Sequence, residues 1–398
     1  MNSAAPLWTK NFILVSLLNF QLVLVFYLLV VAIVGYVISD LQASTAQAGL
    51  VSGLFIVGTL FGRLLVGKFL DKFGPKITLV VGLIGFLIFS VLYFIQMDVP
   101  ALLIVRFGHG FMMGLASTVL GTVIAQIIPA TRRGEGIGYY SMSSTLGTAI
   151  GPFLAIWMML HTGYHAIFAL SSVVSLLCLA LASLLTIPHL IASKNSNKAE
   201  NSDHKPSFIS QYIEIRALPI AIIMLMASIC YSGVLSFVNF YAKEIQLVEA
   251  ASLFFLMYAI AILCSRPFTG PLMDRKGENI IMYPAFIIMA FALLLLSQAE
   301  SSTTLLICAA LLGLGYGNVQ SVCQTVAVKS TSLDRMGYAT STFFIFLDAG
   351  LGFGPYFLGI ALNYIDYSSL YFYSAIAAGI CMVFYYLLHG KTAKMKQV

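Results

Sequence analysis

Long apolar runs, separated by short charged or Pro/Gly-bearing turns, dominate the pattern along the chain. A bilayer core about 30 Å thick is spanned by a helix of about 20 apolar residues. Runs of that order recur at 12–38, 45–70, 76–96, 99–126, 136–160, 164–188, 217–242, 248–272, 279–297, 303–328, 337–362 and 367–389. The pattern predicts an all-α integral membrane protein with twelve transmembrane helices.

One long polar stretch interrupts the series after the sixth run. It includes the segment SKNSNKAENSDHKPS, whose composition is typical of a flexible, solvated linker. We therefore predict an N-terminal six-helix bundle over 1–190, a cytoplasmic linker over 191–216 and a C-terminal six-helix bundle over 217–398. The first apolar run is too long for the apolar core of a cleavable signal peptide, so we expect it to remain as the first span.

The composition strengthens the membrane interpretation. Hydrophobic residues make up 60% of the chain and charged residues 9%, against about 25% charged residues in soluble domains. This excludes an ordinary soluble enzyme. The six cysteines lie in apolar runs without CxxC spacing, which favours small packed side chains over a disulfide framework or a metal site.

The charge distribution predicts the orientation. The formal net charge is +6, but the basic residues form short clusters between apolar runs instead of a nucleic-acid-binding stripe. With both termini in the cytoplasm, 19 of the 21 basic residues face inward, since only Lys243 falls in an outer loop and Arg106 in a span. The positive-inside rule thus predicts a multi-pass protein of the inner (cytoplasmic) membrane with cytoplasmic termini.

An internal repeat relates the two halves at a constant shift of 203 residues. The pairs are Arg63/Arg266, Gly67/Gly270, Asp71/Asp274, Gly74/Gly277, Gly110/Gly313, Gly114/Gly317, Arg132/Arg335, Gly134/Gly337, Gly147/Gly350, Gly151/Gly354 and Pro152/Pro355. Chance matching in a glycine-rich chain does not readily produce eleven pairs without one insertion. Two halves in the same orientation indicate a pseudo-two-fold axis along the membrane normal, an arrangement in which transporters bind substrate near the midplane.

Three motifs resemble those of the major facilitator superfamily. The segment from Gly67 to Lys76 (GKFLDKFGPK) resembles the family's loop between its second and third helices. The segment RFGHG at 106–110 resembles its fourth-helix motif, and GTAIGP at 147–152 its fifth-helix antiporter motif. The resemblance covers nearly the whole chain and implies two pseudo-symmetric six-helix bundles that rock to alternate access.

The chain also resembles the family's drug and metallophore efflux branch, including opine-metallophore exporters. It shares an arginine in the fourth helix, a loop similar to R-x-E-G and an aspartate before glycines in the eleventh helix. Ala155 and Ile156 follow the antiporter motif where that branch usually has further small residues, so this match is partial. The resemblance implies a proton antiporter.

The resemblance also implies a cytoplasmic latch that stabilises the outward-open state. Its predicted residues are Gly67, Asp71, Lys72, Gly74, Lys76, Arg132, Arg133, Glu135, Gly270, Asp274, Arg275 and Gly277. A carboxylate is favoured at a helix N-terminus by the helix dipole, and the alternative is an ordinary solvated cluster of charges. Because Asn279 stands where the first copy has Lys76, we expect the second latch to be the weaker.

Asp348 and Arg106 fall inside predicted spans, where charge is costly and usually functional. Asp348 lies well inside span eleven, and burial would favour its reversible protonation; the alternative is an aspartate that fixes helix packing. The resemblance implies a link between Arg106 and proton transfer, and the alternative is a structural arginine that satisfies backbone carbonyls. The adjacent His109 either titrates or forms an ordinary hydrogen bond.

Further residues predict close packing or a polar lining. The packing positions are Gly147, Gly151, Pro152, Gly350, Gly354 and Pro355. The candidate substrate-binding residues are Asn19, Gln21, Tyr231, Ser232, Ser236, Asn239, Asn318, Gln320 and Gln324. Hydrogen bonding between helices is the alternative role for these polar groups; a lining role suits a cationic or zwitterionic organic molecule.

The sequence thus predicts a proton-coupled secondary transporter that exports a small organic compound, drug-like or a metallophore. It is expected to act as a monomer in the lipid bilayer, with substrate and protons as partners, the proton gradient as energy source, and no cofactor, metal or nucleic acid. A proton symporter or a facilitator importing a nutrient is the first alternative, because both use the same fold. A membrane enzyme would need a catalytic motif such as HExxH, GxSxG or a Walker loop, none of which occurs. A non-transporting receptor is the remaining alternative.

Overall fold

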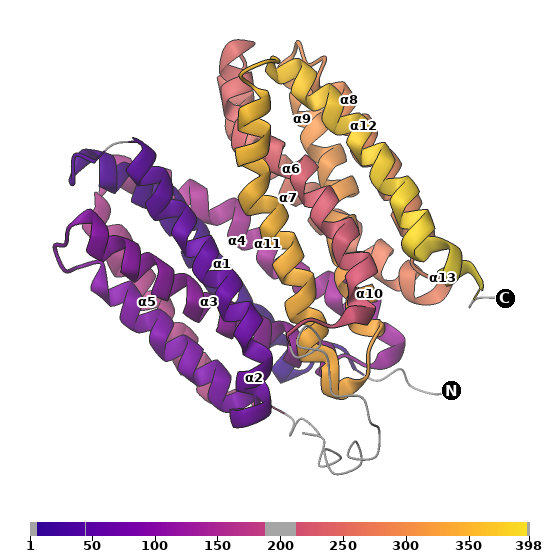
Figure 1. Ribbon diagram of the computed structural model, residues 1–398, viewed down its shortest axis with the longest axis horizontal. Helices are drawn as coiled ribbons and strands as arrows, with labels where there is room; N and C mark the ends of the chain where they lie inside the picture. The colour runs from indigo at the N-terminus through magenta and orange to yellow at the C-terminus, as the bar shows by residue number, and fades with distance from the viewer. Residues whose placement is uncertain (1–5, 44, 188–211, 396–398) are drawn as a thin grey trace. The chain divides into compact units, whose positions relative to one another are not determined.

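The computed structural model describes residues 6–43, 45–187 and 212–395, and all its regular elements in that part of the chain are helices (Figure 1). The predicted linker 191–216 lies outside the described residues except for its last five positions. The helices are α1 (Lys10–Ser39), α2 (Thr45–Leu92), α3 (Val99–Ile127), α4 (Arg133–His161), α5 (Tyr164–Ser183), α6 (Leu218–Glu244), α7 (Val248–Lys276), α8 (Asn279–Leu296), α9 (Ser302–Leu312), α10 (Asn318–Lys329), α11 (Met336–Ala361), α12 (Tyr367–Tyr385) and α13 (Lys391–Met395).

Eleven helices among the described residues are long and apolar enough to cross a membrane. The helices α9 and α10 form one of them, joined through a five-residue π-turn at Gly313–Gly317. Another, Gln47–Leu92, has 46 residues, more than twice the length that one crossing requires. It covers most of two predicted spans, 45–70 and 76–96, with Gly74 between them.

The break at Gly74 has a backbone cause that the second repeat shares. Gly74 has φ 77° and ψ 168°, and Gly277, 203 residues later, has φ 81° and ψ 170°. This region of backbone space is essentially restricted to glycine, because a Cβ would clash there. The two glycines therefore end the first helix of each pair with the same turn.

Helix starts follow the same spacing. Corresponding helices begin at Val99 and Ser302, at Arg133 and Met336, and at Tyr164 and Tyr367, each pair 203 residues apart. A short 3-10 turn precedes α4 at Ala130–Arg132 and α11 at Leu333–Arg335, again in register. The repeat that the sequence indicates is thus also a repeat of local structure.

Close helix contacts recur in register as well. A Cβ at Gly110 would lie 1.9 Å from the carbonyl oxygen of Phe55, and one at Gly313 would lie 2.5 Å from that of Tyr258, the residue 203 positions after Phe55. Such contacts bring backbones together in membrane helices, where packing drives association. The same glycine-to-backbone contact therefore holds α3 on α2 in one half and the α9–α10 span on α7 in the other.

Contacts divide the chain into two units. Unit 1 comprises Met1–Pro129, Ser143–Ile215 and Thr331–Thr342, and includes α1, α2, α3 and α5. Unit 2 comprises Ala130–Met142, Arg216–Ser330 and Phe343–Val398, and includes α6 to α10 and α12. Each unit thus contains one segment from the other repeat, the beginning of α4 in unit 2 and the beginning of α11 in unit 1. The predicted contiguous bundles, 1–190 and 217–398, stay a prediction.

Candidate functional site

Asp274, near the end of α7, binds the N-terminus of α4 within unit 2. Its carboxylate accepts hydrogen bonds from the backbone N–H of Gly134 at 2.7 Å and of Glu135 at 2.8 Å. Lys329 Nζ lies 3.2 Å from the same carboxylate, whose side chain is 8% exposed. The first N–H groups of a helix have no partner within the helix and carry the positive end of its dipole. The carboxylate therefore satisfies two such donors while losing most of its contact with solvent.

Two glycines allow this approach. A Cβ at Gly270 would lie 2.6 Å from Cα of Glu135, and one at Gly134 would lie 2.9 Å from Oδ1 of Asp274. Since the first of these contacts is with backbone, rotation of a side chain could not relieve it. The two glycines make the distance between α7 and α4 as short as the carboxylate–amide contact requires.

The other predicted gating residues of unit 2 surround this contact. Arg132 forms two 2.7 Å hydrogen bonds to Glu135 three residues later, a bidentate pair that braces the start of α4. Nε of Arg133 is buried and has no hydrogen-bond partner among the described residues. Arg275 is exposed, and Gly277 forms the left-handed turn after α7.

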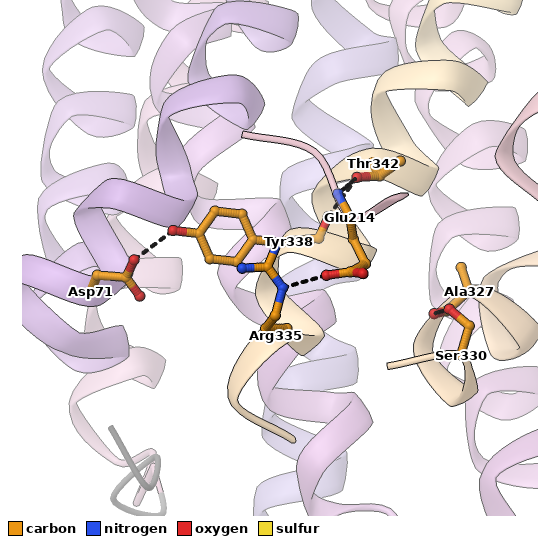
Figure 2. Close-up of polar contacts among 7 residues, drawn as sticks. All are labelled: Asp71, Glu214, Ala327, Ser330, Arg335, Tyr338 and Thr342. Carbon is orange, nitrogen blue, oxygen red and sulfur yellow. Dashed lines mark hydrogen bonds and ion pairs between the residues drawn. The ribbon is translucent and has the colours of Figure 1, made fainter. Parts of the chain in front are cut away.

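Asp71, the first-repeat counterpart of Asp274, makes a different contact within unit 1. It is an exposed residue whose carboxylate accepts a 2.5 Å hydrogen bond from the hydroxyl of Tyr338, near the start of α11 (Figure 2). The ring of Tyr338 lies on Gly67, where a Cβ would be 2.3 Å from its Cε1 atom. Lys72 and Lys76 are exposed.

A second bond supports the same contact between α2 and α11. Ser341 Oγ donates to the backbone carbonyl of Arg63 at 2.5 Å, and Ser341 is 1% exposed. The start of α11 thus contacts α2 through one partly buried and one buried hydrogen bond.

The hydrogen bonding of the two copies runs against the expected order of strength, and the weaker second latch stays a prediction. Among the described residues, the largely buried Asp274 accepts from two backbone N–H groups and faces Lys329, whereas the exposed Asp71 accepts from the hydroxyl of Tyr338. The expectation rested on Asn279, which stands in the second repeat where the first has Lys76, and Asn279 makes its hydrogen bonds away from Asp274. Asn279 donates to the carbonyl of Gly390 at 3.0 Å and accepts from Tyr385 at 2.7 Å, which ties α8 to the end of α12.

Sequence reasoning missed Tyr338 and Glu214. Glu214 is 4% exposed, its backbone N–H donates to Thr342 Oγ1 at 2.9 Å, and its carboxylate accepts from Arg335 Nε at 2.5 Å (Figure 2). The 203-residue register could have found Tyr338, because it pairs this position with Glu135. No comparable signal marks Glu214.

Arg106 and His109 lie in a closed network inside unit 1, and both are 0% exposed. Arg106 Nε donates to the carbonyl of Val51 at 3.1 Å and Nη1 to the hydroxyl of Tyr93 at 3.2 Å. The guanidinium also lies over the ring of Phe55, 4.6 Å from its centroid, a cation–π geometry. No ion pair to Arg106 occurs in the part of the chain that the structure describes.

Both ring nitrogens of His109 have partners. Nδ1 lies 3.0 Å from the hydroxyl of Tyr93, and Nε2 lies 3.3 Å from Oγ of Ser90. Because Tyr93 accepts from Arg106, its own hydrogen can point to Nδ1, which places the imidazole proton on Nε2. This order of donors fits a neutral, hydrogen-bonded histidine, one of the two roles considered from the sequence.

Asp348 lies at the thirteenth position of the 26-residue helix α11 and is half-buried within unit 2. About 18 Å of helix precede it at 1.5 Å per residue. Two positions later, a Cβ at Gly350 would lie 2.5 Å from Cβ of Ser228 and 2.7 Å from the carbonyl oxygen of Leu225 on α6. The carboxylate is therefore near the middle of its span, beside a close contact between α11 and α6.

The remaining packing residues form equivalent contacts. In unit 1, a Cβ at Gly147 or Gly151 would meet α1, at 2.8 Å from Val23 and 2.7 Å from Tyr27. In unit 2, a Cβ at Gly354 would lie 2.1 Å from Oγ of Ser232. Pro152 and Pro355 lie inside α4 and α11.

Several predicted substrate-binding residues have partners inside their own unit. Asn19 donates to Ser143 at 2.8 Å and to Ser144 at 2.7 Å, and Gln21 accepts a 3.3 Å contact from Cys178. These bonds correspond to the alternative role, interhelical hydrogen bonding.

The unit 2 members differ in burial. Tyr231 stacks on Tyr316 with ring centroids 4.0 Å apart, Asn318 donates to the carbonyl of Leu314 at 2.8 Å, and Ser232 is fully buried. Gln324 is buried with Nε2 lacking a partner among the described residues. The other members of the set are half-buried or exposed: Ser236, Gln320 and Asn239.

Comparison with known proteins places this architecture in a family. The sequence model of the Major Facilitator Superfamily matches residues 15–302 and 248–397. The chain belongs to the major facilitator superfamily. It is therefore a multi-pass membrane transporter, as the resemblance of its motifs predicted, and that prediction is confirmed.

Individual relatives are more distant. Multidrug resistance protein 1 of Bacillus subtilis is 24% identical over 88% of this chain and 90% of its own length. The staphylopine export protein of Staphylococcus aureus is 22% identical over 65% of this chain and 64% of its own. Among solved structures, the proton:xylose symporter XylE superposes with a TM-score of 0.72 at 15% identity, covering 95% of each chain. The structural likeness shows the shared fold.

Proposed function

We propose that this major facilitator transporter is a proton-coupled exporter of a small organic compound, drug-like or a metallophore. The observation that carries the proposal is Asp348, a carboxylate in the middle of a membrane span. A carboxyl group can bind and release a proton, and this one lies beside the close contact between α11 and α6. Intramembrane ionisable residues commonly belong to ion or substrate pathways.

The relatives support the direction of transport. The B. subtilis protein is named for multidrug resistance and the S. aureus protein for staphylopine export. The alternative is a proton symporter or facilitator that imports a nutrient, and XylE, with the same fold, is a proton:xylose symporter. Fold therefore does not decide direction.

The proposal includes a topology and a cycle. The chain spans the cytoplasmic membrane twelve times as a monomer, with α2 counted as two spans, and both termini are cytoplasmic. The cycle needs no cofactor, because the proton gradient supplies the energy. Protonation of Asp348 from outside releases the substrate, the halves rock, and the contacts at Asp71 and Asp274 open and close the cytoplasmic side. Arg106 fixes the packing of α3 on α2 during this motion.

Direction can be tested in inside-out membrane vesicles in which respiration acidifies the interior. A panel of cationic dyes, antibiotics and metallophores is offered outside, and uptake into the vesicles is measured with and without an uncoupler. We expect at least one compound to accumulate in the vesicles in a way that the uncoupler abolishes. Accumulation only in right-side-out vesicles would establish import instead, and uptake unaffected by the uncoupler would establish a facilitator.

A further inference from the structure

The two repeats brace their helix starts with different carboxylates. In the first repeat, Arg132 pairs with Glu135 on the next turn of the same segment. In the second repeat, Arg335 occupies the position of Arg132, but Tyr338 stands in the position of Glu135. The second arginine thus has no acidic residue three positions later.

Glu214, which lies outside α11, pairs with Arg335 instead. Its carboxylate lies 2.5 Å from Arg335 Nε, with the glutamate side chain 6% exposed and the arginine side chain 36% exposed. Its backbone N–H is fixed as well, through the 2.9 Å bond to Thr342. Figure 2 shows both bonds reaching from Glu214, one to Arg335 in the 3-10 turn before α11 and one to Thr342 within α11.

The contact continues from Arg335 to Asp71. The guanidinium of Arg335 lies over the ring of Tyr338, 4.6 Å from its centroid, and the hydroxyl of that ring donates to Asp71. A planar guanidinium fixed by a carboxylate is well suited to stack on an aromatic ring. The four side chains therefore form one continuous series within unit 1, from Glu214 through Arg335 and Tyr338 to Asp71.

Binding of an arginine by the residue at the position of Glu214 occurs in the second repeat and not at the equivalent position of the first. The residue 203 positions before Glu214 is Asn11, whose amide donates to the carbonyl of Thr186 at 2.7 Å instead of binding an arginine. A nearby contact joins the same segment to α2, since Lys68 Nζ lies 2.5 Å from the hydroxyl of Tyr212. The segment that enters α6 is thus attached to both α2 and α11.

We infer that Glu214 supplies the carboxylate that the second repeat lacks and is a positioning residue of the gate, holding Arg335 and Tyr338 against Asp71. Glu214, in the short described stretch that precedes α6, is thereby part of the contact between α2 and α11. The gating role rests on the proposed alternating-access function, whereas the positioning itself can be measured without transport.

The test uses a cysteine beneath this contact. Ser341→Cys places a thiol at a position that is 1% exposed, so N-ethylmaleimide reacts with it only when the contact between α2 and α11 opens. Labelling of the full-length protein in membranes is measured above the baseline of the parent, in which five of the six native cysteines are buried. Asp334→Asn is the matched control, because Asp334 is exposed and adjacent to Arg335.

In the Ser341→Cys protein, Glu214→Gln and Arg335→Gln are each expected to raise the labelling rate about fivefold. Each removes the charge-assisted bond between Glu214 and Arg335, whose arginine side is partly exposed. The double variant should label no faster than the faster single variant, because both changes break the same bond. Asp334→Asn should stay within about twofold of the protein that carries Ser341→Cys alone. An unchanged rate in Glu214→Gln, or singles that multiply to about 25-fold in the double variant, would overturn the inference.

Vesicle transport of the same variants separates this inference from the proposed function. Faster labelling of Glu214→Gln in a protein that transports none of the offered compounds supports the positioning and counts against the proposed export. Normal labelling of Glu214→Gln in a protein that does transport supports export and overturns the role of Glu214.

Discussion

The two copies of the gating motif hold equivalent aspartates in different ways. Asp274 binds backbone N–H groups at the start of α4 and is largely buried, whereas Asp71 binds the hydroxyl of one tyrosine and is exposed. A backbone donor is present whatever side chain occupies the position, so the Asp274 contact depends on close approach of the helices. The Asp71 contact depends on the position of one ring, which Arg335 stacks against.

This difference shows that a repeat in sequence can preserve helix starts and glycine contacts while its polar contacts diverge. Glu135 and Tyr338 occupy equivalent positions, and the donor is the backbone N–H at the first and the side-chain hydroxyl at the second. We therefore expect the two copies to respond differently to equivalent substitutions. Amide hydrogen exchange in residues 130–142 and 331–342, measured by mass spectrometry, reports the opening of each contact separately.

Gly270→Ala should have the largest effect. Its Cβ would lie 2.6 Å from Cα of Glu135, whereas the Cβ of Gly67→Ala would meet the ring of Tyr338. A ring can rotate away and backbone cannot, so we expect a cost of about 3 kcal/mol, or about 100-fold faster exchange of 130–142, at the upper end of overpacking effects. Gly67→Ala should cost about 1 kcal/mol and affect 331–342.

Gly53→Ala is the control for both substitutions, because a Cβ there would have nothing within 4 Å. Equal effects of Gly270→Ala and Gly67→Ala would show that the backbone contact of the second copy is no tighter than the ring contact of the first.

Asp274→Asn should have the next largest effect. It removes the charge from a carboxylate that accepts two backbone N–H bonds and faces Lys329. Charge-assisted bonds of this kind contribute about 2 kcal/mol, so exchange of 130–142 should accelerate about 30-fold. Asp71→Asn should change exchange of 331–342 by about fivefold or less, because Asp71 is an exposed residue that accepts from a neutral hydroxyl. A larger acceleration by Asp71→Asn than by Asp274→Asn would support the expectation that the second latch is the weaker.

Tyr338→Phe should have a smaller effect that is confined to one copy. It removes the hydroxyl that donates to Asp71 but keeps the ring that lies on Gly67. We expect a change of about 1 kcal/mol in the opening of 331–342 and none in 130–142. Comparable acceleration in both segments would mean that the two contacts open as one unit.

The smallest effect concerns the turn after each motif, where Glu278 and Asn279 replace Pro75 and Lys76. Glu278 Oε1 lies 2.8 Å from Nε2 of His389, and this hydrogen bond lowers the pKa of Glu278 below its ordinary value. A lowered pKa stabilises the folded state fully above the ordinary glutamate pKa of about 4.3, and the gain is lost as the pH falls through the lowered value.

Glu278→Gln should therefore lower the thermal unfolding temperature in detergent at pH 7, by an amount equivalent to about 1 kcal/mol or less. The difference from the parent should shrink as the pH falls below about 4.3. A difference that stayed constant to lower pH would mean that the charge of Glu278 contributes nothing to this contact.

Much of the fold could be predicted because it depends on patterns along the chain. Apolar runs of membrane length gave the helix positions, and glycines at a fixed spacing gave the contacts between neighbouring helices. The polar contacts were harder, because they depend on which distant segments meet. The sequence pointed to a carboxylate at a helix N-terminus, but that geometry occurs at Asp274 and not at Asp71.

Glu214 shows the same limit. It lies at the end of a polar segment and belongs to no motif, and only its contacts with Arg335 and Thr342 reveal its place. The alternatives for Arg106 and His109 could be weighed from the sequence, whereas the order of donors through Tyr93 required coordinates.

The central claim is that export is coupled to protons through Asp348. It is tested most directly in proteoliposomes that contain a pH-sensitive dye, with an imposed proton gradient and a transported compound added on one side, comparing the parent with Asp348→Asn. We predict that protons move opposite to the compound in the parent and that this movement is lost in the variant. Proton movement that persists in Asp348→Asn, or transport by the parent with no proton movement, would contradict the account.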